Sequence, residues 1–176
     1  MLDSKHTVTQ LTAEEFHRDV PGLAEVLADS VEGGASIGFL DPFGRADAAA
    51  WWLDQAAAVA DGRLLVWVSR DREGISGTIS LAPNGKANGR HRAEVSKLLV
   101  HRRARGQGLG RALLTVAEQA AAVAGRTLLL LDTQTGSPAE SLYLASGWTR
   151  FGIVPDYAGV PDGTLSECSF FYKQLR

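Results

Sequence analysis

A basic, glycine-rich stretch at residues 100–114, VHRRARGQGLGRALL, has the composition of an anion-binding loop. Apolar residues precede it and apolar residues at helical spacing follow it, which predicts a strand before the glycines and a helix after them. A glycine loop at the start of a helix brings backbone N–H groups together with the positive end of the helix dipole, so it binds phosphate. The stretch therefore predicts a site for a phosphorylated ligand, with its arginines directed at that anion.

The spacing of the glycines excludes two common phosphate-binding loops. A dinucleotide fingerprint, G-x-G-x-x-G, fails from Gly106 because Arg111 stands at the third glycine, and it fails from Gly108 because Leu113 stands there. A P-loop counted from Gly106 also meets Arg111 where its second glycine belongs. The pattern that remains is R-x-x-G-x-G, formed by Arg105, Gly108 and Gly110.

A group of aromatic residues between positions 38 and 55 could receive a cationic amine, because aromatic faces attract cations. Its members are Phe39, Phe43, Trp51 and Trp52, with the acids Asp41 and Glu32 nearby. The alternative is that the tryptophans pack a helix on a sheet. Asp41 and Trp52 are kept as candidate substrate contacts.

The segment PDYAGVPDG at 155–163 has the prolines and glycines of a loop. Such a loop could border the site of an acceptor molecule. Asp156 and Tyr157 are its candidate substrate contacts.

The pattern of apolar and turn residues predicts alternating helices and strands. Strands are expected at 6–12, 63–71, 75–81, 91–100, 126–132, 148–154 and 166–175. Helices are expected at 13–31, with an interruption at Pro21, and at 46–60, 109–123 and 137–146. A capping box, Thr12 with Glu15, begins the first helix, and Gly125 ends the third. The segments at 75–81 and 63–71 are expected to form a hairpin.

The four consecutive leucines at 128–131 are typical of a strand that is buried on both faces, as parallel strands are. Strand, glycine loop, helix and leucine strand together form a βαβ unit. The strands at 91–100 and 126–132 should therefore run parallel.

Composition narrows the classes of protein. The chain has 176 residues, which fits one domain. With 22% charged residues and a net charge of −2, neither a disordered tail nor a nucleic-acid-coating protein is indicated. The single cysteine, Cys168, excludes an internal disulfide and is interpreted as a core residue. With no long apolar stretch or signal sequence, a cytoplasmic protein without a membrane or nucleic-acid partner is expected. No metal is expected, and a homodimer is left open.

Two segments resemble a known family. LLVHRRARGQGLGRALL resembles the acetyl-CoA-binding motif of the GNAT superfamily of N-acetyltransferases, and AESLYLASGW resembles its later A-x-x-x-Y-x-x-x-G-[FW] segment. VEGGASIGF, LLLLDTQTGSPAE and PDYAGVPDG are similar to segments of one branch, the tabtoxin-resistance acetyltransferases. The chain departs from the superfamily pattern at Arg102, where a proline is common, and at Gly136, where an asparagine is frequent.

The resemblance implies a GNAT fold over a single domain, residues 1–176. This α/β (α+β) fold has a central mixed, mostly antiparallel and twisted sheet of about seven strands, flanked by about four helices. Acetyl-CoA is the implied cosubstrate. The residues expected to bind it are Leu98, Leu99 and Val100 along the pantetheine, and Arg105, Gly106, Gln107, Gly108, Leu109, Gly110 and Arg111 around the pyrophosphate. Arg103 could approach the 3′-phosphate, and the alternative is that it belongs to a solvated basic face.

Acetylation of an amine needs a base, because an alkylammonium has a pKa of about 10 and must lose a proton before it attacks the thioester. By resemblance, Glu94 is expected to be that base, acting through water, with Asp132 as its partner. Tyr143 is the implied acid that protonates the coenzyme thiolate. Each has a plainer alternative: Glu94 could pair with Arg90 or Arg92, Asp132 could cap a turn, and Tyr143 could pack in the core.

The expected activity is transfer of acetyl from acetyl-CoA to a primary amine of a small molecule, such as an antibiotic or a tabtoxinine-β-lactam-like toxin. A protein-amine acetyltransferase and a sensor that binds acetyl-CoA without turnover are the alternatives.

Overall fold

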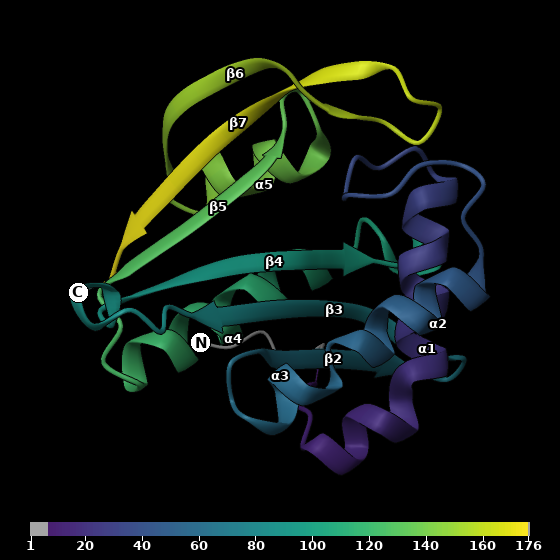
Figure 1. Ribbon diagram of the computed structural model, residues 1–176, viewed down its shortest axis with the longest axis horizontal. Helices are drawn as coiled ribbons and strands as arrows, with labels where there is room; N and C mark the ends of the chain where they lie inside the picture. Colours follow the sequence, from purple (N-terminus) through teal and green to yellow (C-terminus); the bar gives the residue numbers. More distant parts are fainter. Residues whose placement is uncertain (1–6, 176) are drawn as a thin grey trace.

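The computed structural model describes residues 7–175, and within them seven strands form one mixed sheet (Figure 1). The strands are β1 (Val8–Gln10), β2 (Leu65–Asp71), β3 (Gly74–Pro83), β4 (Arg92–Val100), β5 (Leu128–Gln134), β6 (Thr149–Gly159) and β7 (Leu165–Gln174), in the order β1-β2-β3-β4-β5-β7-β6. β4 and β5 are parallel, and the other neighbours are antiparallel. The predicted sheet, hairpin and parallel pair are confirmed. His6, with which the first strand was expected to begin, lies outside the described residues.

Five α-helices lie in the described part of the chain, one more than expected. They are α1 (Ala13–Glu32), α2 (Arg45–Asp54), α3 (Ala56–Ala60), α4 (Leu109–Val123) and α5 (Pro138–Ala145), with short 3-10 turns η1 (Ala87–Gly89) and η2 (Arg102–Ala104). The additional helix arises because the helix expected at 46–60 is divided at Gln55. The expected end of α4 is confirmed, since Gly125 follows it with φ of 75°.

The first helix is not interrupted at Pro21, contrary to the prediction. The capping box holds: Thr12 Oγ1 accepts from Glu15 N (3.2 Å) and Glu15 Oε2 accepts from Thr12 N (2.8 Å). α1 then continues through the proline to Glu32. Buried apolar residues such as Val20 and Leu23 lie on both sides of Pro21, and their packing outweighs the loss of one backbone hydrogen bond.

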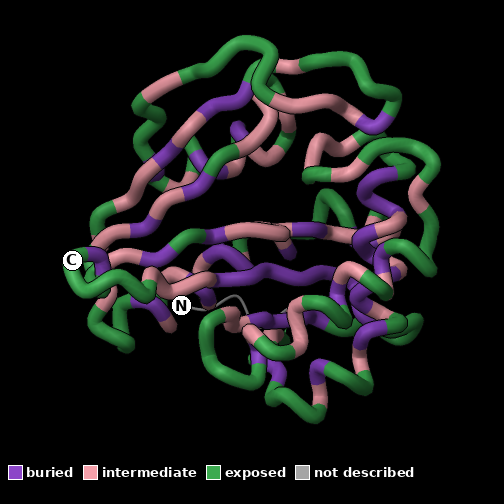
Figure 2. The backbone as a smooth tube through the Cα atoms, viewed as in Figure 1, coloured by how far each residue is buried: buried purple, intermediate pink, exposed green. Residues whose placement is uncertain are grey.

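Two apolar clusters lie on opposite faces of the sheet. α1, α2 and α3 cover one face of β2 and β3, where Phe16, Leu27 and Val66 are buried. α4 and α5 cover the other face, where Leu113, Leu129 and Phe171 are buried. Figure 2 shows the buried backbone concentrated along the strands and on the inner sides of these helices.

β4 and β5 separate after a short stretch of pairing, and this separation makes room for a site. Only 92–94 of β4 are in register with 128–130 of β5, and the two strands diverge beyond these residues (Figure 1). The divergence opens the sheet at the carboxyl ends of its parallel pair, where ligands of such sheets bind.

The leucine strand is buried on one face, not on both as expected. Leu129 and Leu131 are buried, whereas Leu128 and Leu130 are only partly covered. The reason is that the α1–α3 layer packs on β2 and β3 and does not reach β5. This uncovered face continues onto β7, where Tyr172 is the register partner of Leu130.

The segment at 155–163 is also not the loop that was expected. β6 extends to Gly159, so the segment begins as a strand and turns only at 160–164. The register shifts between Val154 and Ala158, and Asp156 has a left-handed φ of 50°. The prolines and glycines therefore mark an irregular edge strand.

Candidate active site

The glycine loop has the geometry of an open helix N-terminus. Gly106 and Gly108 have φ values of 72° and 82°, a region that residues with side chains rarely adopt. Gly108 is the N-cap of α4, so the first backbone N–H groups of the helix follow it directly. A Cβ on Gly110 would lie 3.2 Å from Cδ2 of Leu142, so this glycine allows α4 to approach α5 closely.

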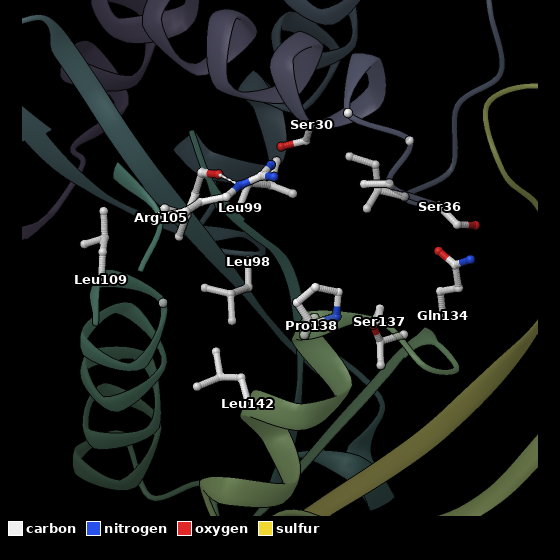
Figure 3. Close-up of a pocket in the computed structure, with 18 of the residues that line it drawn as sticks. Ser30, Ser36, Leu98, Leu99, Arg105, Leu109, Gln134, Ser137, Pro138 and Leu142 are labelled. Atoms are coloured by element: carbon white, nitrogen blue, oxygen red, sulfur yellow. Dashed lines mark hydrogen bonds between the residues drawn. The ribbon is translucent and has the colours of Figure 1, made fainter. Parts of the chain in front are cut away.

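A cavity of about 620 Å³ lies between this loop, β4, α5 and the end of α1. Figure 3 shows Arg105 and Ser30 near one end of it, Ser36 and Gln134 near another, Leu98 and Pro138 between them, and Leu142 below these residues. Eight of the predicted cofactor-binding residues line it: Leu98, Leu99, Val100, Arg105, Gly106, Gly108, Leu109 and Gly110. Gln107 and Arg111 lie outside the lining.

The arginines of the loop have different partners, which the sequence did not indicate. Arg102 binds Asp29 and also Glu32, the latter at 2.6 Å. Arg103 is held by Asp71 at 3.1 Å and by the carbonyl of Ile75, and only 18% of its side chain is exposed. These pairs anchor the loop to α1 and to the β2–β3 turn, so Arg102 and Arg103 are not directed at an anion as expected.

Arg105 is the arginine that reaches the cavity. Its Nε donates to the carbonyl of Val100 at 3.0 Å, which fixes the side chain along the cavity wall. Among residues 7–175, no carboxylate lies within ion-pair distance of it. Its guanidinium can therefore bind an anion in the cavity.

Glu94 and Asp132 come together from the two diverging strands. Partial burial raises the pKa of the Glu94 carboxyl, and the charge of Asp132 raises it further. Neither plainer alternative is observed in the described residues: Glu94 has no ion pair with Arg90 or Arg92, and the N-cap of α5 is Ser137, not Asp132. Two coupled carboxylates at a strand opening can accept and relay a proton.

The thiol of Cys168 is a neighbour of Asp132 that sequence reasoning missed. Cys168 is buried, as expected, but its Sγ also donates to Oδ2 of Asp132 at 3.4 Å. Burial, with the nearby Asp132 charge, raises the pKa of this thiol to about 12, so it stays protonated as a donor. Only the register between β5 and β7 reveals this contact, because 36 residues separate the two in sequence.

Tyr143 lies inside the core beside this cluster. Its ring packs against Trp148 and Phe171 at centroid distances of 5.9 and 6.0 Å, and it does not line the cavity. Its neighbours on α5, Ala139 and Leu142, do line it. Burial, with the charge of Asp132, raises the pKa of the Tyr143 phenol, so the group remains protonated.

A buried carboxylate fixes the loop between β5 and α5. Glu140 accepts hydrogen bonds from the backbone N–H of Gly136 (2.6 Å), from Ser169 Oγ (2.6 Å) and from Arg150 (3.0 Å). These bonds lower the pKa of Glu140, the Ser169 bond most. Because 133–137 line the cavity, Glu140 holds one of its walls.

Lys97 on β4 was not singled out from the sequence, although its partners were. Its Nζ lies 4.8 Å from the ring centre of Trp51 and 5.6 Å from that of Phe39, and it donates to the carbonyl of Ile37 at 3.2 Å. The aromatic group thus receives a cation, but this cation belongs to the chain. The sequence feature that could have pointed to Lys97 was the aromatic group itself, because no lysine or arginine had been assigned to it.

The four predicted substrate contacts are dispersed. Trp52 is fully buried against Phe16, so the prediction that it contacts substrate is wrong. Asp41 is exposed, and its backbone N–H donates to the carbonyl of Pro161. Asp156 is exposed at the β6 irregularity. Tyr157 is half exposed and packs edge-on against Phe170, the register partner of Asp132.

Residues 7–175 show neither a metal-binding cluster nor a membrane-spanning helix. They contain no group of three or more His, Cys, Asp and Glu residues placed to hold a metal ion. They also contain no helix with the length and apolar character needed to cross a bilayer.

Comparison with known proteins gives consistent results. Residues 28–148 match the model of the acetyltransferase (GNAT) family. A ribosomal-protein-alanine N-acetyltransferase from Brucella melitensis is similar in structure, with a TM-score of 0.77 and 23% identity over 96% of this chain and 99% of that one. A phosphinothricin acetyltransferase from Sinorhizobium meliloti, solved with acetyl-CoA, has a TM-score of 0.78 and 21% identity over 97% and 88%. A GCN5-related N-acetyltransferase from Kribbella flavida has a TM-score of 0.75 and 23% identity over 96% and 98%. At these identities the similar structures show a shared fold.

Proposed function

The chain belongs to the acetyltransferase (GNAT) family, and from that premise we propose that it transfers the acetyl group of acetyl-CoA to a primary amine of a small molecule. The observation that carries the proposal is the cavity where β4 and β5 diverge, with the glycine loop in its wall and the Glu94–Asp132 pair on the same two strands.

Each part of the coenzyme would have a partner in the cavity. The pyrophosphate would lie on the N–H groups at the start of α4, with Arg105 as its cationic partner. The pantetheine arm would lie along 98–100 of β4, where β5 no longer pairs and backbone groups can bond to its amides. A backbone N–H of this stretch would polarise the thioester carbonyl and stabilise the oxyanion.

The reaction then needs three proton transfers. Glu94, acting through water and with Asp132 as its partner, would take a proton from the ammonium of the acceptor. The amine nitrogen attacks the carbonyl carbon, the C–S bond breaks, the thiolate leaves, and the nitrogen, now bonded to the acetyl group, loses its second proton to water. Tyr143, whose neighbour Leu142 on α5 lines the cavity, would give that thiolate its proton, and its phenolate would regain a proton from water.

For the acceptor, we propose a small-molecule amine such as an antibiotic or a tabtoxinine-β-lactam-like toxin. Two observations support this: the segments VEGGASIGF and PDYAGVPDG resemble those of tabtoxin-resistance acetyltransferases, and a structure of similar fold is named a phosphinothricin acetyltransferase.

A thiol-release assay with acetyl-CoA and a panel of amines tests the proposal. The panel holds simple alkylamines, amino-acid antibiotics and a peptide with an N-terminal alanine. Turnover of small amines over the peptide is expected. Turnover of the peptide alone would indicate a protein acetyltransferase, and tight coenzyme binding without turnover would indicate a sensor.

Replacing Arg105 with glutamine is expected to weaken acetyl-CoA binding by about tenfold, because one charge-assisted contact to the pyrophosphate is lost. The difference from wild type should shrink at high salt. Titration calorimetry at two salt concentrations measures both effects. Arg63→Gln, which removes an exposed arginine paired with Asp61, is the matched control. Unchanged affinity in Arg105→Gln would contradict the assignment.

A further inference from the structure

An aromatic group formed by Phe39, Phe43 and Trp51 holds a cation supplied by the chain itself. Phe39 stacks on Phe43 with ring centres 4.4 Å apart, and Trp51 meets Phe39 edge-on at 5.5 Å. The ammonium of Lys97 lies over Trp51 and Phe39, at 4.8 and 5.6 Å from the ring centres. These distances are typical of a cation–π contact. We call the space over Trp51 and Phe39 the aromatic seat.

The seat lies directly beside the cavity. Lys97 immediately precedes Leu98 on β4, and its Nζ donates to the carbonyl of Ile37 at 3.2 Å; both neighbours line the cavity. The backbone of Lys97 has a left-handed φ of 49° where the β3–β4 register shifts. This irregularity of β4 lies on its β3 side, in the part of β4 that no longer pairs with β5.

The ammonium of Lys97 is close enough to the carboxylate of Asp132 for their charges to interact. Burial lowers the pKa of Lys97, and the charge of Asp132 acts in the opposite direction. Asp132 also acts on Glu94. An amine that approaches these carboxylates therefore meets the ammonium of Lys97 nearby, and the aromatic surface over Trp51 and Phe39 is already filled by it.

We propose that Lys97 is a specificity-determining residue, whose ammonium fills the aromatic seat and so disfavours acceptor amines that carry a second cationic group. The inference rests on the proposed amine acetylation. Its physical basis is that like charges repel strongly in partly buried surroundings, and that a cation–π site holds only one cation.

The first test concerns the seat alone and needs no turnover. Lys97→Ala empties the seat, so propylammonium is expected to shift the indole N–H resonance of Trp51 in a saturable manner. Wild type and Lys97→Arg, which keep the seat filled, should show no such shift, and uncharged propanol should give none in any variant. Trp51→Phe assigns the resonance. Absence of a saturable shift in Lys97→Ala would overturn the proposal.

The second test compares two acceptors of equal length, pentylamine and its diamine cadaverine. The ratio of kcat/KM for cadaverine to that for pentylamine is expected to rise about tenfold in Lys97→Ala, the factor equivalent to about 1.4 kcal/mol. Lys97→Arg and the exposed control Lys86→Ala should keep the wild-type ratio.

The outcomes separate this inference from the proposed function. If both amines lose the same factor in Lys97→Ala, Lys97 only supports the site and the inference is wrong. If wild type acetylates no amine, the proposed function fails, and the propylammonium titration still decides whether Lys97 fills the seat. If Lys97→Ala does not fold, Lys97→Gln removes the charge with less loss of volume, and the same two measurements apply.

Discussion

Glu94→Gln is expected to lower kcat for amine acetylation by about two to four orders of magnitude, the range typical for loss of a general base. Glutamine keeps the shape of the side chain but cannot accept the proton of the acceptor ammonium. Affinity for acetyl-CoA should change little, because Glu94 does not line the cavity where the coenzyme would lie. Steady-state kinetics with a reactive amine, together with coenzyme titration, measures both quantities.

The pH profile of the same reaction gives an independent test. A base must be deprotonated, so kcat/KM should fall as the pH drops through the pKa of Glu94. Burial and the charge of Asp132 both raise that pKa, so the acidic limb should lie above the ordinary value of 4.5. Asp132→Asn removes one of the two causes and should move the limb to lower pH. Glu14→Gln, an exposed change in the first turn of α1, should leave the profile unchanged.

If Glu94→Gln retained full kcat, or if Asp132→Asn left the acidic limb in place, the pair would not form the proton path. A loss of folded protein is separated from a loss of chemistry by the coenzyme titration, since an unfolded variant would also lose binding.

The sequence predicts the fold where local patterns dominate. The capping box at Thr12, the glycine loop and the alternating strands all depend on neighbours within a few residues, and all are found. Pro21 and the leucines at 128–131 gave wrong expectations because tertiary packing decided them: α1 is held together by its buried face, and the helix layer stops short of β5.

The candidate site divides in the same manner. The spacing of the glycines at 106–110 predicts their role, because that role depends on backbone conformation. Contacts between distant segments could not be predicted in this way. Arg102 pairs with Asp29, 73 residues away, and the ammonium of Lys97 lies over the ring of Trp51. Charge and residue type suggested that several arginines would bind the anion, and only partner geometry shows that Arg105 is the one at the cavity.

Tyr143→Phe is expected to lower kcat by about two orders of magnitude while changing the Kd for acetyl-CoA by less than about twofold. The phenol is protonated at working pH and would give its proton to the departing thiolate, whereas phenylalanine has no proton to give. Phenylalanine keeps the ring that packs between Trp148 and Phe171, so the core should retain its packing. Steady-state kinetics measures kcat, coenzyme titration measures the Kd for acetyl-CoA, and thermal unfolding measures the stability of the core.

The leaving group distinguishes an acid from a packing residue. Protonation of a thiolate matters less as the thiol becomes more acidic, so an acetyl donor with a more acidic thiol than coenzyme A should recover part of the lost kcat in Tyr143→Phe. Tyr172→Phe on β7, which also removes the hydroxyl of a partly buried tyrosine, should give no such recovery because it loses no kcat. If Tyr143→Phe lost kcat and coenzyme affinity by equal factors, or lost only thermal stability, the hydroxyl would serve packing, and the thiolate would take its proton from water.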